Sequence, residues 1–78
     1  MNSPKIKSIK VNSQSYSISV LFDNGVTKDI DFKDKIKEDF YSDLKNKLLF
    51  EQAKVDLVGY GISWNDDIDI SEYELWNM

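Results

Sequence analysis

The first 32 residues alternate between apolar and polar side chains, and this alternation predicts three antiparallel strands. Residues 6–12 mix lysine with isoleucine and valine, which is typical of an edge strand because charge there discourages stray pairing. Residues 16–22 place apolar side chains at every second position, with serines between them. Asp23-Asn24-Gly25 supplies turn residues that tolerate positive φ, and residues 26–32 form the return strand. A three-stranded meander is therefore predicted.

From residue 34 onward the apolar residues recur about every four positions, which predicts helical structure. The apolar stripe consists of Ile36, Phe40, Leu44, Leu48 and Leu49. Ser42 and Asn46 are both good N-cap residues, so the segment forms either one helix or two short pieces. In the second case, Asn46 begins a helix over residues 47–52.

The last third of the chain returns to strand-like patterns. Residues 53–56 and 61–64 are predicted to pair as a hairpin around a turn at Gly59. Residues 71–76 are predicted to form a helical turn that Ser71 caps.

These patterns predict one domain over residues 1–78, of the α+β class. We expect a small antiparallel sheet of four to five strands, a three-stranded meander plus a C-terminal hairpin, packed with one or two short helices. The predicted core is Ile18, Val20, Phe22, Ile30, Phe32, Leu44, Leu48, Phe50, Val55, Ile62 and Trp64.

Composition excludes several classes of protein. The chain has 78 residues and no cysteine, so it carries neither a disulfide framework nor a thiolate metal site. The N-terminal residues show no apolar signal region, and no apolar run approaches the roughly 20 residues that span a bilayer. We therefore expect a cytoplasmic protein without membrane contact.

Charge is distributed unevenly along the chain. Residues 56–78 contain six acidic residues and no base, whereas residues 1–55 contain all ten lysines and eight acidic residues. The chain has no arginine and no basic face, both of which nucleic-acid readers commonly use. Direct nucleic-acid binding is therefore not expected, and a basic protein is the favoured partner.

Catalytic chemistry has few candidates, because the absence of His and Cys removes the commonest general base and the thiol nucleophile. A carboxylate pair or a lysine-based site stays open, but no catalytic residue and no cofactor is predicted. The Gly59-Tyr60-Gly61 segment runs into a strand rather than a helix, which does not fit a phosphate-binding loop. We interpret Gly59 as the turn residue and Gly61 as a bulge or a close backbone approach.

Asn65, Asp67 and Asp69 resemble the start of a calcium-binding loop. Ile70 and Trp76 then stand where that loop needs glycine and a bidentate glutamate, so no metal ligand is assigned. A turn in which short acidic side chains bond nearby backbone amides is the favoured interpretation.

Aromatic residues are more numerous than a core of this size easily hides, and aromatic side chains are enriched as anchors in protein interfaces. Trp76 either covers an open sheet edge or is exposed. If it is exposed, it forms a partner-binding surface with its acidic and aromatic neighbours. The candidate partner-binding residues are Asp66, Asp67, Asp69, Glu72, Tyr73, Glu74 and Trp76.

The pattern Gly61-Ile62-x-Trp64-x-x-x-Ile68-Asp69-Ile70 resembles a family of small bacterial proteins that is catalogued as domain of unknown function 2442. Supporting residues elsewhere are Phe22, Asn24, Gly25, Phe50, Val55 and Asp56. The resemblance implies a compact α+β domain and no assigned catalytic residue. Some relatives carry the domain before a helix-turn-helix, and others are encoded beside a second small protein in pairs that look like toxin–antitoxin operons.

The favoured hypothesis is a small non-enzymatic protein-binding or regulatory module, in its specific form an antitoxin-like partner of a basic protein. The alternatives are a divalent-cation-binding domain and a homo-oligomeric structural domain. A homodimer is the simplest form of the second, because an edge strand or an exposed Trp76 can pair across a two-fold axis.

Overall fold

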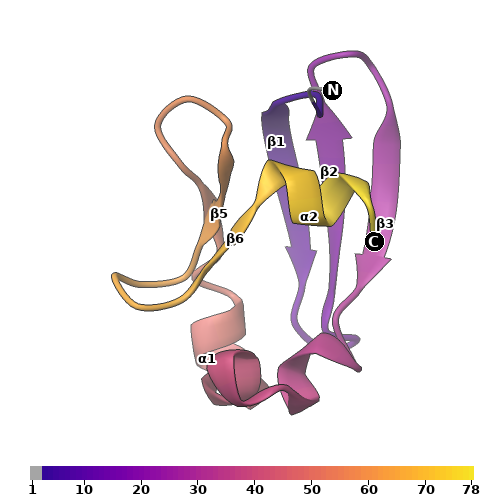
Figure 1. Ribbon diagram of the computed structural model, residues 1–78. Coiled ribbons are helices and arrows are strands. Elements are labelled where there is room, and N and C mark those ends of the chain that lie inside the picture. Colours follow the sequence, from indigo (N-terminus) through magenta and orange to yellow (C-terminus); the bar gives the residue numbers. More distant parts are fainter. Residues whose placement is uncertain (1–2) are drawn as a thin grey trace.

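The predicted meander forms the larger of two antiparallel sheets. A computed structural model describes residues 3–78, and its first three strands are β1 (Ile6–Asn12), β2 (Ser17–Phe22) and β3 (Thr27–Asp31). They pair in the order β1-β2-β3 (Figure 1). The alternation in β2 buries every second side chain, as predicted.

The second sheet contains one strand more than the predicted hairpin. It consists of β4 (Lys54–Val55), β5 (Gly61–Ser63) and β6 (Asp69–Ser71), paired in the order β4-β5-β6. The α+β class is confirmed, but the strands divide between two sheets of three. β6 was not predicted because the run is only three residues long and gains its order from pairing with β5, where Ile62 lies opposite Ile70.

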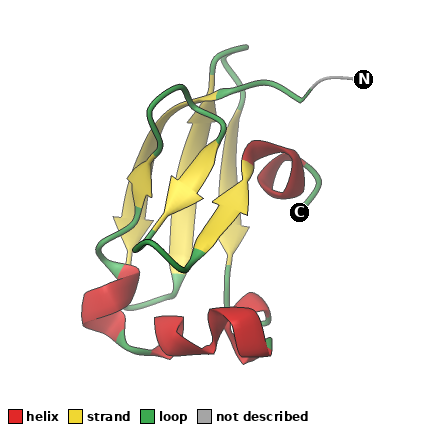
Figure 2. Ribbon diagram, turned by 60° about the vertical axis from the view of Figure 1, so that its left-hand side comes forward, coloured by secondary structure: helices red, strands yellow, loops and turns green. Residues whose placement is uncertain are grey.

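The two sheets face each other across the core, and the short helices between β3 and β4 lie at one end (Figure 2). On one side, the Ile6 amide donates to the Gly59 carbonyl at 2.8 Å, which links β1 to the β4–β5 turn. On the other side, helix α2 (Glu72–Trp76) follows β6 and crosses the face of the larger sheet (Figure 1). Its predicted cap is confirmed, since the Ser71 hydroxyl accepts from the Glu74 amide.

The segment between β3 and β4 is helical, but most of it is 3₁₀ helix. It comprises η1 (Lys35–Lys37), η2 (Asp39–Lys45) and α1 (Lys47–Phe50). Extended backbone at Glu38 and Asn46 separates the three pieces. The Asn46 side chain accepts from two amides at the start of α1, so the predicted second helix is confirmed, although it ends at Phe50.

The observed core matches most of the predicted core. Phe32, Phe50 and Trp64 pack edge-on or tilted against one another, and Trp64 Nε1 donates to the Phe50 carbonyl at 3.1 Å. Leu48 was predicted wrongly, since 75% of its surface is exposed, and Val55 is only half-buried. The core also contains residues that were not in the predicted core: Ile6, Ile36, Tyr41, Ile68, Ile70 and Leu75.

Candidate partner-binding surface

The predicted metal-like stretch forms the turn between β5 and β6. Asn65 Oδ1 accepts from the amides of Asp67 and Ile68, both at 2.9 Å, and this geometry brings the Ile68 carbonyl to the Trp64 amide. Asp66 and Asp67 are exposed on this turn. In the part of the chain that the structure describes, no three acidic side chains are grouped to hold a metal ion. The geometry favours the turn interpretation.

Two predicted residues are exposed and also contact the helical segment, Glu74 through its side chain and Asp69 through its backbone carbonyl. Glu74 forms an ion pair with Lys35 at 2.8 Å, and the Lys35 side chain is only 16% exposed. The hydrogen bond with Glu74 raises the pKa of Lys35, against the opposing effect of burial. The carbonyl of Asp69 accepts from the Tyr41 hydroxyl at 3.2 Å, and burial raises the pKa of that hydroxyl.

Trp76 packs against the larger sheet. Its ring makes an edge contact with Phe22, with 4.9 Å between the centroids, and Lys28 Nζ lies 5.5 Å from the ring centre. The side chain is half-buried at the margin of the core. The ring therefore packs against the core, which differs from both alternatives, a cover for an open sheet edge and an exposed side chain.

The start of α2 presents the remaining predicted residues. Tyr73 is 62% exposed and Glu72 is half-buried. The Glu72 amide donates to the Tyr60 carbonyl at 2.8 Å, so this end of α2 lies beside the β4–β5 turn. The predicted residues therefore fall into three environments: the β5–β6 turn, the contacts with the helical segment and the core, and the start of α2.

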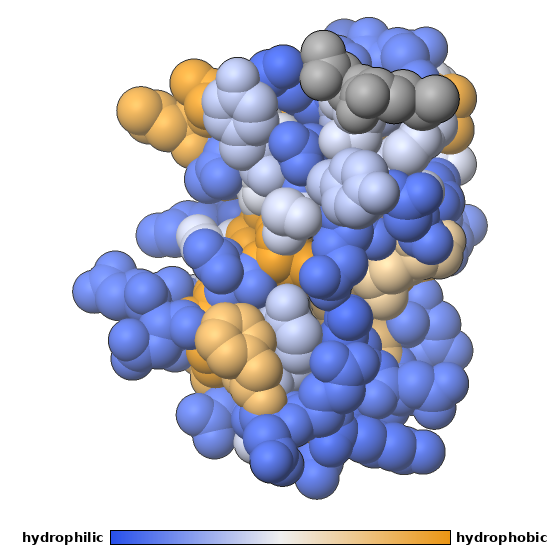
Figure 3. Space-filling model, viewed as in Figure 1, coloured by the Kyte–Doolittle hydropathy of each residue, from blue (hydrophilic) through white to orange (hydrophobic). Residues whose placement is uncertain are grey.

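The β4–β5 turn carries an exposed apolar cluster, which we call the β4–β5 tip and define as Leu57, Val58 and Tyr60. These side chains are 99%, 57% and 51% exposed, respectively. Figure 3 shows apolar side chains projecting from the molecule over this turn. Asp56 Oδ1 accepts from the Tyr60 amide at 2.9 Å, and the Gly59 carbonyl is bonded to β1. The tip is thus held in place while its side chains face solvent.

The family of the chain follows from a comparison with family models. The model described as "Protein of unknown function (DUF2442)" matches residues 6–77. The chain belongs to this family. No curated protein and no solved structure matches the chain.

The match to DUF2442 confirms the resemblance carried by the Gly61 to Ile70 pattern, and the structure shows what that pattern does. A Cβ atom on Gly61 would lie 2.5 Å from the Ile70 carbonyl oxygen, so the predicted close backbone approach is confirmed. Gly59 has φ +81°, which confirms its assignment to the turn. Both glycines therefore serve the smaller sheet.

Sequence reasoning missed the β4–β5 tip in this DUF2442 domain. A signal was present, because Leu57, Val58 and Tyr60 are large apolar residues at a turn, where polar side chains are usual. No helix within residues 3–78 is long and apolar enough to cross a membrane.

Proposed function

We propose that this DUF2442 domain is a non-enzymatic protein-binding module that docks through the β4–β5 tip and the adjoining start of α2. The observation that carries the proposal is the exposure of Leu57, whose side chain is fully open to solvent on an anchored turn. Apolar and aromatic side chains that are grouped on a surface are typical of interface anchors. Tyr73 at the start of α2 is a second exposed tyrosine, and it follows Glu72, whose amide donates to the Tyr60 carbonyl.

The charge around the tip indicates the kind of partner. Asp56 precedes Leu57, Glu72 lies beside Tyr60, and no base follows residue 55. Lys5 lies with its Nζ 4.7 Å from the Tyr60 ring centre and balances only part of this charge. A basic protein with an apolar pocket fits such a surface. An antitoxin-like role, in which the domain covers a basic partner, is the specific form of this proposal.

The test is capture of a partner by the tagged domain from its native cell, followed by binding assays with the purified partner. The tip variant is Leu57→Ser with Tyr60→Ser. The matched control is Leu48→Ser, which also removes an exposed leucine but lies on α1, at the other end of the molecule (Figure 1). We expect one stoichiometric basic partner, at least about tenfold weaker binding by the tip variant, and unchanged binding by the control.

The acidic residues are tested separately by salt dependence. Glu72→Gln should weaken binding and reduce its sensitivity to salt, because the lost charge adjoins the tip. Asp66→Asn with Asp67→Asn removes two charges from the β5–β6 turn and tests whether that turn contributes to partner binding. Equal binding by the wild type and the tip variant would refute docking through the tip.

A further inference from the structure

The outer edge of β3 presents backbone groups that no strand within residues 3–78 pairs with. The Phe32 amide donates to the Tyr16 carbonyl, and the Phe22 amide donates to the Val26 carbonyl. Since the pairing is antiparallel and regular, the even-numbered residues of β3 bond to β2. The amides and carbonyls of Thr27, Asp29 and Asp31 therefore point toward the open edge.

A groove of about 430 Å³ runs beside this edge. Ile30 and Met78 supply its apolar lining. Its charged lining consists of Asp29, Asp31, Asp34, Glu38 and Lys35. Lys35 is already paired with Glu74 and, at 3.6 Å, with Glu38, so the groove offers an excess of negative charge to an incoming chain.

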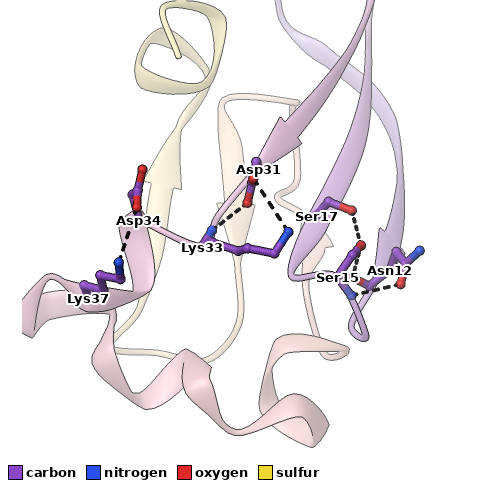
Figure 4. Close-up of polar contacts among 7 residues, drawn as sticks. All are labelled: Asn12, Ser15, Ser17, Asp31, Lys33, Asp34 and Lys37. Carbon is purple, nitrogen blue, oxygen red and sulfur yellow. Dashed lines mark hydrogen bonds and ion pairs between the residues drawn. The ribbon is translucent and has the colours of Figure 1, made fainter.

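Two exposed lysines near the groove leave this excess largely intact, and a third, Lys28, is occupied by the carbonyls of Trp76 and Met78. Figure 4 shows Lys33 beside Asp31 and Lys37 beside Asp34. Their nitrogen–oxygen distances are 3.7 and 3.6 Å, and all four side chains are well exposed. Exposed pairs of this kind contribute little, and Asp31 Oδ1, which also accepts from the Lys33 amide at 2.8 Å, keeps further acceptor capacity. Both carboxylates therefore stay available to a basic ligand.

We propose that the β3 edge accepts a basic, extended segment of the partner as a fourth strand of the larger sheet. This inference rests on the proposed protein-binding function and assigns the partner a second contact. Strand addition pairs the free backbone groups and leaves specificity to alternate side chains. On the outer face, lysine or arginine side chains would meet Asp29 and Asp31. On the inner face, apolar side chains would meet Ile30 and Met78.

A second copy of the chain fits this edge less well than a basic segment does. Pairing β3 with β3 across a two-fold axis would bring Asp29 and Asp31 of one copy against the same residues of the other. Like charges that face each other across strands are destabilising. The charge of the edge thus disfavours self-pairing and selects a basic strand.

The experiment titrates the whole domain at low salt with a synthetic, end-capped peptide, Lys-Val-Lys-Thr-Lys-Thr. Binding is measured by the NMR chemical shifts of the backbone amides. We expect saturable shifts centred on the amides of Thr27, Asp29 and Asp31, together with slower hydrogen exchange there. Asp29→Pro removes an outward amide without removing a β2–β3 hydrogen bond, and it should abolish peptide binding. Asp29→Asn with Asp31→Asn keeps the amides and should weaken binding at least about fivefold through lost charge.

The control peptide replaces each lysine with glutamate. Equal binding of both peptides, or shifts that avoid β3, would overturn the inference. Concentration-dependent shifts at the same amides without peptide would also overturn it, in favour of self-pairing. The tip variant, Leu57→Ser with Tyr60→Ser, should bind the peptide Lys-Val-Lys-Thr-Lys-Thr as the wild type does. If capture of the partner depends on the tip but the peptide does not bind, only strand addition at the β3 edge is refuted. If the peptide binds but capture does not depend on the tip, docking through the tip is refuted.

Discussion

Lys28 on β3 holds the C-terminal end of α2 through the backbone of Trp76. Lys28 Nζ donates to the Trp76 carbonyl at 2.5 Å and to the Met78 carbonyl at 2.9 Å. A helix of five residues is not stable alone, so its order comes from tertiary contacts. A cation at the C-terminal carbonyls satisfies groups that the helix itself leaves unpaired and opposes the negative end of its dipole.

We predict that Lys28→Met lowers the free energy of unfolding by about 1–2 kcal/mol, because it removes this cation from the end of α2. Lys28→Arg keeps the charge and should lose less than half as much. Urea denaturation gives both values, and amide exchange in α2 should accelerate only in the methionine variant. Equal stability of the wild type and Lys28→Met would show that α2 is held by its apolar side chains alone.

Gly59 and Gly25 offer a matched pair of substitutions. Both have positive φ, +81° and +87°, but a Cβ atom on Gly25 meets nothing within 4 Å. A Cβ atom on Gly59 would lie 2.5 Å from the Ile6 carbonyl oxygen, in the link between β1 and the β4–β5 turn. Gly25→Ala should cost about 1–2 kcal/mol for the left-handed backbone alone. Gly59→Ala should cost clearly more, and equal thermal stability of the two variants would contradict the close approach.

The elements that could be predicted from the sequence are those whose cause is local. The alternation in β2 can be read from consecutive residues of one strand. The capping side chains of Asn46 and Ser71 accept from amides no more than three residues further along the chain. The order of β6 instead depends on pairing with β5. The ion pair of Lys35 with Glu74 joins residues that are far apart in the sequence, and no periodicity indicates it.

The helical segment shows why a correct period still gave wrong core residues. A spacing of four aligns residues on one face of an α-helix, but a 3₁₀ helix has three residues per turn, so that spacing drifts around the axis. Ile36 and Leu44 stay buried because each belongs to a separate short helix. Phe40 and Leu48, from the same predicted stripe, are exposed. Extended backbone at Glu38 and Asn46 ends each helix, so the next helix turns a different set of positions toward the core.

This difference predicts opposite outcomes for two leucines that look equivalent in the sequence. Leu44 is fully buried, so Leu44→Ala should cost about 2–5 kcal/mol through lost burial and the cavity left behind. Leu48→Ala should change stability by no more than about 0.5 kcal/mol, as is usual for exposed positions. Both values come from the same denaturation experiment. Comparable losses would mean that residues 36–48 form a single amphipathic helix, the first of the two alternatives that the sequence left open.

Alkaline pH should weaken the contact between the helical segment and α2. The pKa of Lys35 is raised in the folded protein, first by its hydrogen bond with Glu74, and the pKa of Tyr41 is raised, first by burial. Both groups therefore hold their protons more tightly when folded than when unfolded. The associated stability is present in full below the unfolded pKa values, about 10, and is lost as the pH rises through the folded ones.

We therefore expect the free energy of unfolding to fall above about pH 10, and to fall less steeply in Lys35→Met and in Tyr41→Phe than in the wild type. Each variant lacks one of the two protons whose release the folded state resists, even though each also loses stability at neutral pH. Tyr73→Phe removes an exposed phenol and is the matched control for Tyr41→Phe. Urea titrations at closely spaced pH values measure the slopes. Parallel curves for the wild type and both variants would show that neither proton is linked to folding, and that the Lys35–Glu74 pair only positions α2.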